Sequence, residues 1–251
     1  MMDPYFWQLP ALALVGFVSG FLNILAGGGS LLTLPMLIFL GLPAVVANGT
    51  NRIGVICQNI FAVASFRRHG VLPLRLALIC TAPSLFGSYL GAQLAVDIDD
   101  QLFQRLLAGI MIGVLIITLL DPAKRLRGRE IAYTPLRLTA LIGAFFLIGI
   151  YGGFVQAGVG FLIIPVMLLA GFDLVRTNAI KIFVVLAFTI PALAVFVWHD
   201  QVDWLLGLVL ALGNASGGWL ASHMAIKKGH DWIKHVVTIT VLVFALRLLW
   251  S

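Results

Sequence analysis

Long runs of apolar residues, separated by short polar or glycine-containing gaps, make up most of this chain. A helix that crosses the hydrocarbon core of a bilayer needs roughly 20 apolar residues, and most of the runs approach that length. The pattern predicts ten helical segments, at 9–26, 30–46, 51–66, 74–96, 102–120, 136–156, 159–172, 177–198, 204–225 and 234–250. The fold class that we expect is therefore all-α, in the form of a polytopic membrane protein.

The second half of this pattern repeats the first at a constant offset of 130 residues. Glycine, proline and asparagine positions that match at this offset are Gly28 with Gly158, Pro35 with Pro165, Gly41 with Gly171 and Asn48 with Asn178. Apolar composition alone does not produce such matches, and internal repeats are typical of secondary transporters. We expect a first transmembrane repeat at 1–120, a basic cytoplasmic linker at 121–135 and a second transmembrane repeat at 136–251, each repeat with five helical segments.

The composition supports a lipid environment. Apolar residues account for 61% of the chain and charged residues for 10%, whereas soluble domains carry about 25% charged residues. A soluble fold of this length would expose much of that apolar surface to water. The net charge of +6 does not indicate nucleic acid, because most Lys and Arg residues lie in the gaps between apolar runs, as orientation in a membrane requires. The expected partner is the lipid bilayer.

The charges in the gaps predict the orientation. The gaps at 67–75, 121–137 and 226–234 are basic and should be cytoplasmic, whereas those at 97–101 and 199–203 carry Asp without Lys or Arg and should face outward. The repeat offset aligns basic gaps with acidic ones, so equivalent loops lie on opposite sides. This predicts inverted-topology repeats in a bacterial inner membrane, with both termini periplasmic. Whether the first two segments of each repeat span or re-enter stays open, because either arrangement gives an odd number of crossings.

Each repeat contains a glycine-rich break between two apolar runs. The residues concerned are Gly27, Gly28, Gly29 and Ser30 in the first repeat and Gln156, Gly158 and Gly160 in the second. Glycine interrupts helices, so we expect short, broken helices here, buried in protein or lining a wet cavity. A helix that begins at such a break points its N–H groups at the cavity, where they attract an anion. The alternative is that the glycines only allow close helix packing.

A polar and cationic group of residues follows each break. The first polar group is Asn48, Gly49, Thr50, Asn51 and Arg52, with Gln58 and Asn59 further on, and the second is Thr177, Asn178 and Lys181. We expect both groups to open a membrane segment, with Gly49 interrupting the first. Charges within a bilayer are expensive and usually functional, and guanidinium and ammonium groups bind oxyanions. The alternative is that Arg52 and Lys181 extend to the interface.

The chain lacks residues that other functions need. Its one glutamate, Glu130, lies in the linker, and no carboxylate lies in the middle of an apolar run, so a carboxylate proton relay has no candidate. An inside-negative potential of 100 mV favours outward movement of each negative charge by roughly 2.3 kcal/mol, which favours export. Metal-ligand spacings and Walker, H-E-x-x-H and G-x-S-x-G motifs are absent from the sequence. We therefore expect no enzyme activity, catalytic residue, metal or cofactor.

Together these motifs resemble the TauE/SafE sulfite exporter family. They are the run from Gly16 to Gly20, the break from Ala26 to Ser30, Pro35 and the run from Ala47 to Asn51, and in the second repeat Gly152, Gly153, Gly158, Gly160, Pro165 and the run from Arg176 to Lys181. The resemblance covers nearly the whole chain. It implies transport of sulfur-containing anions, with binding residues at the breaks and in the polar groups. Val159 and Ile180 stand where Gly and Thr are more usual, which implies a drier second half of the site.

The sequence thus predicts a transporter that moves a small sulfur-containing anion (sulfite, thiosulfate or an organosulfonate) outward by alternating access. The expected substrate-binding residues are Gly27, Gly28, Gly29, Ser30, Asn48, Thr50, Asn51, Arg52, Gln58, Gln156, Gly158, Gly160, Asn178 and Lys181. Two other functions stay open: proton- or sodium-coupled uptake of a similar anion, and a membrane accessory subunit that transports nothing. A homodimer also stays open, whereas no nucleic-acid partner is expected.

Overall fold

The described part of the chain is helical. The computed structural model describes residues 5–25, 27–120 and 135–249, and its helices are α1 (Tyr5–Leu25), α2 (Ser30–Phe39), α3 (Ala44–Arg68), α4 (Leu74–Val96), α5 (Asp100–Leu120), α6 (Pro135–Phe154), α7 (Val159–Leu169), α8 (Leu174–Trp198) and α9 (Trp204–Leu249). These ranges contain no strand, which confirms the all-α prediction. Nearly all of the predicted linker, 121–134, lies outside the described residues.

Among the described residues, five helices are long and apolar enough to cross a membrane, namely α4, α6, α8, most of α1 and the first part of α9. Large apolar side chains cover their outward faces: Leu14, Leu147 and Leu212 have 66%, 64% and 74% of their surface exposed. Extended apolar surfaces of this kind are unfavourable in water and match the interior of a bilayer. The chain is therefore an integral membrane protein, as its composition predicts.

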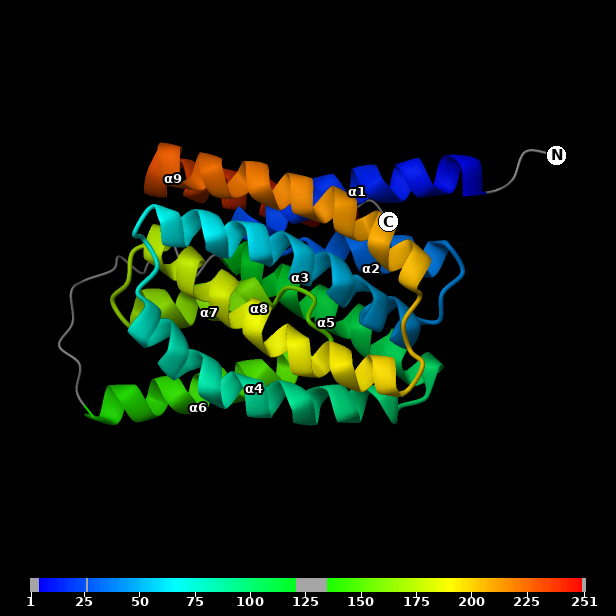
Figure 1. Ribbon diagram of the computed structural model, residues 1–251, viewed down its shortest axis with the longest axis horizontal. Coiled ribbons are helices and arrows are strands. Elements are labelled where there is room, and N and C mark those ends of the chain that lie inside the picture. Colours follow the sequence, from blue (N-terminus) through cyan, green and yellow to red (C-terminus); the bar gives the residue numbers. More distant parts are fainter. Residues whose placement is uncertain (1–4, 26, 121–134, 250–251) are drawn as a thin grey trace.

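The long helices lie roughly along the long axis of the molecule (Figure 1). α1 and α9 pack along one edge, α4 and α6 pack along the opposite edge, and α3 and α8 lie between them. Glycines allow these close contacts. A Cβ atom on Gly217 of α9 would lie 2.0 Å from the carbonyl oxygen of Phe17 in α1, and one on Gly153 of α6 would lie 2.0 Å from that of Ser88 in α4. Close backbone contact of this kind holds helices together in lipid.

The two repeats interlock. α1 and α4 belong to the first repeat, yet each packs most extensively on a helix of the second, α9 and α6 respectively. The two contacts are equivalent, because the repeat offset pairs α1 with α6 and α4 with α9. Helices at equivalent places begin 130 residues apart: Tyr5 and Pro135, Ala44 and Leu174, Leu74 and Trp204. This reciprocity fits the predicted repeat, while the repeat boundaries and the inverted relation stay predictions.

α2 and α7 are too short to cross a bilayer. They contain 10 and 11 residues, roughly 15 Å of helix, against a hydrocarbon thickness of about 30 Å. The predicted segments at 30–46 and 159–172 are therefore too long. Each helix is followed by a glycine with a φ of 96°, Gly41 or Gly171, whose N–H donates to a carbonyl of the last turn. Glycine in this conformation ends a helix, although the apolar run continues past it.

α3 and α8 begin earlier than predicted. α3 starts at Ala44 and runs without interruption through Gly49, and α8 likewise starts before its polar group. The prediction that the two polar groups open these segments, with a break at Gly49, is therefore wrong. A Cβ atom on Gly49 would lie 2.1 Å from the carbonyl oxygen of Gln201. This glycine allows the loop before α9 to approach α3 and does not interrupt the helix.

α9 is one helix of 46 residues, where we predicted two segments separated by a basic gap at 226–234. The predicted interruption of the helix is wrong, because the gap contains no proline and its one glycine, Gly229, is tolerated within a helix. A straight helix of this length would measure roughly 69 Å. In Figure 1 the red C-terminal part of α9 lies behind its orange part, not beyond it. The helix is therefore not straight, and its membrane-spanning candidate ends at Ala225.

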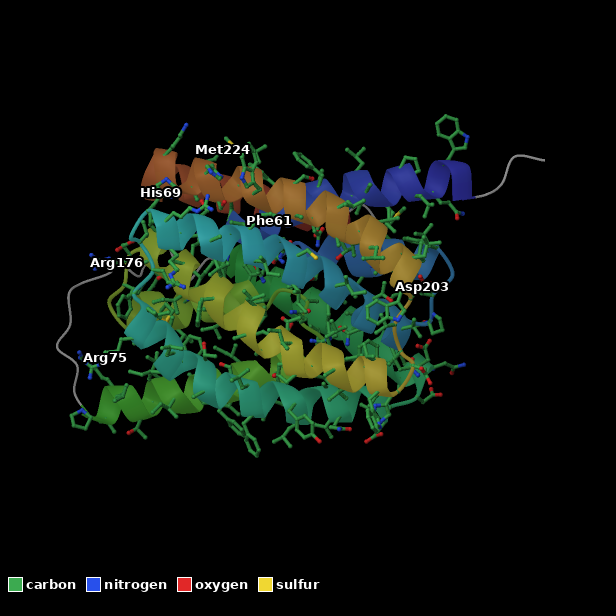
Figure 2. All side chains as sticks on the ribbon, in the orientation of Figure 1. Phe61, His69, Arg75, Arg176, Asp203 and Met224 are labelled. Carbon is green, nitrogen blue, oxygen red and sulfur yellow. The ribbon has the colours of Figure 1, made fainter. Side chains whose placement is uncertain are left out.

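Charged side chains lie at the two ends of this helix bundle. Figure 2 shows Arg75 and Arg176 at one end, with His69 near them, and Asp203 at the opposite end. The separation follows the basic and acidic gaps of the sequence, and it leaves the charges where a surrounding bilayer would expose them to water. Which end faces the cytoplasm stays a prediction from the distribution of Lys and Arg.

Candidate functional site

The two glycine-rich breaks meet inside the molecule. The first lies between α1 and α2 and the second between α6 and α7. Gly27 has a φ of 85°, and a Cβ atom on it would lie only 2.3 Å from the Cα atom of Gly160. Both predicted breaks are therefore present. Their glycines interrupt the helices and also allow close packing, so the two roles that the sequence left open are combined.

The first break leaves no room for side chains. A Cβ atom on Gly28 would lie 2.7 Å from the ring of Phe161 in α7, and one on Gly29 would lie 2.3 Å from the carbonyl oxygen of Ser19 in α1. α2 begins directly after these glycines, so the N–H groups of its first turn point back toward the break. α7 begins at the second break in the same way.

The second break contains strained backbone. Gln156 has a φ of 57°, and Gly158, the N-cap of α7, has a φ of 68°. A positive φ is uncommon for a residue with a side chain and costs of order 1–3 kcal/mol. The Gln156 amide nitrogen donates to Thr189 Oγ1 at 2.5 Å, whereas its amide oxygen has no partner among the described residues. Strain of this kind clusters at functional sites.

Asn51 holds the start of α2 against α3. Its amide nitrogen donates to Ser30 Oγ at 3.0 Å, and its amide oxygen accepts a hydrogen bond from Thr33 Oγ1 at 2.6 Å. All three side chains are at most 2% exposed. Two predicted site residues, Ser30 and Asn51, therefore lie together at the first break, where their side chains bond each other.

Arg52 is fully buried, so the alternative that it extends to the interface does not hold. Its guanidinium donates to the carbonyl oxygens of Gly152 and Gly153 at 3.1 and 2.5 Å. It also lies 4.6 Å from the centre of the Phe196 ring. The two carbonyls belong to the end of α6, where the helix dipole is negative. Arg52 therefore stabilises the end of a broken helix of the other repeat.

Lys181 stabilises the other broken helix in the same manner. It is 2% exposed, and its ammonium donates to the carbonyl oxygens of Asn23 and Ile24, at the end of α1, at 3.1 and 2.9 Å. Each repeat thus contributes one buried cation that caps a helix of the other repeat. A helix C-terminus carries about half a negative charge, so each cation is only partly neutralised.

Asn48 and Thr50, also predicted for the site, hold neighbouring segments. Asn48 Nδ2 donates to the carbonyl oxygen of Phe154, the last residue of α6, at 2.7 Å. Thr50 Oγ1 accepts from the backbone N–H of Asp203 at 2.9 Å, directly before α9. Asn48 therefore acts beside Arg52 at the second break, whereas the contact of Thr50 is with the loop before α9.

A small cavity lies where the two breaks meet. Gly27 and Gly160 line it together with Lys181, Asn59 and Asn23. Its volume is about 10 Å³, enough for about one water molecule, so an oxyanion would require a wider conformation. Gly160 belongs to the first turn of α7. The cavity therefore combines a helix N-terminus, an ammonium group and two amides, and such a combination attracts an anion.

Several buried amide side chains have atoms without a hydrogen-bond partner among the described residues. Gln58, Asn178 and Asn214 lack a partner at both amide atoms, and Asn59 lacks one at Nδ2. Buried polar groups are normally paired, and exceptions call for an explanation such as water or a ligand. Asn23 and Asn214 were not predicted for the site, and Asn59, although named with the first polar group, was not among the expected substrate-binding residues. The signal that could have found them is an amide in the middle of an apolar run.

Two broken helices that meet at a buried polar centre in an integral membrane protein are an arrangement typical of transporters. In the described ranges, no three His, Cys, Asp or Glu side chains come close enough together to hold a metal ion. The centre instead offers N–H, ammonium and guanidinium donors.

Comparison with known proteins identifies the kind of transporter. The chain belongs to the TauE/SafE family, because the family model for the sulfite exporter TauE/SafE matches residues 12–248. The probable membrane transporter protein ORF9 of Sinorhizobium sp. is 30% identical over 99% of this chain and 95% of its own. Probable membrane transporter proteins of Haemophilus influenzae and Escherichia coli K12 (YfcA) are 29% and 27% identical, over 92% and 97% of this chain and 90% of theirs. No solved structure matches the chain.

The family match confirms the resemblance seen in the sequence. It covers both glycine-rich breaks, both polar groups and all described helices except the ends of α1 and α9. The protein is therefore a membrane transporter of this family.

Proposed function

We propose that this transporter moves a small sulfur-containing anion, such as sulfite, thiosulfate or an organosulfonate, out of the cell across a bacterial inner membrane. The observation that carries the proposal is the meeting of two broken helices at a cavity lined by Lys181 and the first turn of α7. The sulfur chemistry of the substrate rests on membership of a family whose model is named for sulfite export.

The electrostatic balance at the centre favours an anion. In their protonated forms, Lys181 and Arg52 each bring one positive charge to a helix C-terminus that carries about half a negative charge. The N-termini of α2 and α7 each add about half a positive charge. No carboxylate among the described residues pairs with either cation. The total stays positive, and burial strengthens its attraction for a negative ligand.

Alternating access by rocking of two helix bundles, one with α1 and α9 and the other with α4 and α6, is the mechanism that we propose. In transporters with inverted repeats, one repeat or bundle moves against the other around a site near the bilayer midplane. The backbone at the two breaks would supply N–H donors, Gln58, Gln156 and Asn178 would supply amides, and the two buried cations would supply charge. Because α1 packs on α9 and α6 packs on α4, each of the two bundles contains helices of both repeats, and each contains one helix that ends at a break.

The outward direction follows from the available driving force. The sequence offers no nucleotide-binding motif and no carboxylate within an apolar run. An inside-negative membrane potential of 100 mV drives each negative charge outward by roughly 2.3 kcal/mol, about a fiftyfold bias in the equilibrium distribution.

Flux measurements on purified protein in liposomes test the proposal. Liposomes loaded with sulfite, thiosulfate or methanesulfonate should release the anion faster when an imposed potassium diffusion potential makes their interior negative. Protein-free liposomes and liposomes with the Lys181→Met variant are the controls. Flux that follows a sodium or proton gradient and ignores the potential would support coupled uptake. Absence of flux for all three anions would contradict transport of this class and favour an accessory subunit.

A further inference from the structure

The two buried cations occupy different surroundings although they are bound alike. Lys181 lines the cavity between the breaks, and Arg52 does not. The guanidinium of Arg52 donates to two carbonyls of α6 and is covered by the ring of Phe196. The ammonium of Lys181 has three N–H donors and uses two on the carbonyls of α1. Only Lys181 therefore combines a free donor with access to the cavity.

About two helical turns further along α3 and α8, two polar side chains also differ in whether they have a free hydrogen-bonding atom. Asn59 and Thr189 are equivalent under the 130-residue offset, and both are at most 2% exposed. Asn59 lines the cavity and its Nδ2 atom has no partner among the described residues. Thr189 donates to the carbonyl oxygen of Val185 and accepts from the amide of Gln156, both at 2.5 Å. The hydroxyl of Thr189 is therefore satisfied within the protein, whereas the amide of Asn59 is not.

We infer that the transported anion binds on one side of the centre, to Lys181 and Asn59 at the first break. The equivalent position at the second break, around Arg52 and Thr189, is a structural copy that binds no ligand. This inference rests on the proposed function, because it assigns a place and a charge to the anion of that function. It makes Asn59 a substrate ligand and limits the chain to one anion. Arg52 then holds the end of α6 and acts on the anion through its charge, without direct contact.

The donors at the first break suit an oxyanion with one charge. The free N–H of Lys181, the two N–H groups of Asn59 Nδ2 and the first turn of α7 at Gly160 all border one cavity. A sulfonate or hydrogensulfite group offers several oxygens to such donors. Lys181 lines the cavity and Arg52 lies outside it, so a monoanion is paired by direct contact, whereas the second charge of a dianion has no direct partner in a low dielectric. Methanesulfonate should therefore bind more tightly than sulfate.

Calorimetric titration of the purified full-length protein with methanesulfonate tests this inference. The variant Asn59→Thr gives the first break a threonine, the residue that stands at the equivalent position, Thr189, beside the second break. Its affinity for methanesulfonate should fall about ten- to a hundredfold, the usual effect of losing a hydrogen bond to a charged ligand. The matched control, Thr189→Val, removes the hydroxyl at the equivalent position and should keep the affinity within about twofold. Wild-type protein should bind one methanesulfonate per chain.

The outcomes separate this inference from the proposed function. Two anions per chain, or an equal loss of affinity in Thr189→Val and Asn59→Thr, would overturn one-sided binding and leave the transporter proposal intact. Wild-type protein that binds none of methanesulfonate, sulfite and thiosulfate would overturn both. If Asn59→Thr does not fold, as judged by circular dichroism, Asn59→Ala takes its place, because it only shortens the side chain.

Discussion

Backbone carbonyl groups at the ends of α1 and α6 need partners, because free polar groups deep in a bilayer are costly. Lys181 and Arg52 provide those partners, each from the other repeat. A cation in this position both satisfies the carbonyls and opposes the helix dipole. The same two side chains raise the positive charge of the centre. Each of these two cations thus both caps a broken helix and helps to attract an anion.

The variant Arg52→Leu should strongly destabilise the protein. It leaves the carbonyls of Gly152 and Gly153 unpaired, and each unpaired buried group costs about 1–3 kcal/mol, so we expect a loss of roughly 2–6 kcal/mol. The measurement is the midpoint of thermal unfolding in detergent, followed by tryptophan fluorescence. Arg68→Leu, at the exposed end of α3, is the control and should change the midpoint little. Equal midpoints for the two variants would show that the contacts of Arg52 add no stability.

The sequence indicated the buried cations and the glycines because charges and helix breakers are rare in apolar runs and therefore informative. It did not indicate their partners. The carbonyls that bind Arg52 lie 100 and 101 positions along the chain, and only tertiary packing brings them near. Thr50 was predicted for the site by its place in a polar group, but its neighbour is the loop before α9. Asn23 was missed because a single amide changes the average polarity of a run very little.

The pattern of apolar residues predicts the ends of some helices well and those of others poorly. The C-terminal ends of α3, α4, α6 and α8 lie close to the predicted ends, because each helix ends near a polar or charged gap or a glycine-rich break. α2 and α7 end within apolar sequence, at glycines whose backbone conformation terminates the helix. The pattern predicts burial in lipid or protein, and a buried turn satisfies it as well as a helix does.

The contact between the breaks should be essential for transport. In Gly27→Ala the new Cβ atom would lie 2.3 Å from the Cα atom of Gly160, and the alanine would have to adopt a positive φ. Gly70→Ala is a matched control, because Gly70 has a φ of 67° and no atom within 4 Å of its Cβ position. Backbone strain is thus similar in both variants, and only Gly27→Ala separates the breaks. We expect flux in liposomes to be lost in Gly27→Ala and retained in Gly70→Ala. Normal flux in Gly27→Ala would mean that the breaks need not touch.

The protein as a whole is arranged so that neither repeat can pack without the other. α1 lies on α9 and α4 lies on α6, with glycines at both contacts (Figure 1). The repeat itself was predictable from glycine and proline matches at one offset. The interlocking was not, because the sequence of one repeat does not state which copy its helices contact.

Equivalent positions of the two repeats should face opposite sides of the membrane. Asp97 and Lys227 are equivalent, exposed and opposite in charge. In protein lacking the native Cys57 and Cys80, a membrane-impermeant maleimide added to intact cells should label Asp97→Cys and should label Lys227→Cys only after the cells are opened. The difference follows from the basic gaps being cytoplasmic. Labelling of both variants in intact cells would contradict the inverted topology and the predicted orientation.

The pairing of α1 with α9 has a consequence for biosynthesis. About 180 residues separate the two helices in the chain, so at roughly 5–20 residues per second the ribosome completes α9 some tens of seconds after α1. During that interval the glycine-rich face of α1 has no native partner. A nascent first repeat must therefore wait in the bilayer, or beside an insertion factor, until translation delivers the helices that complete it.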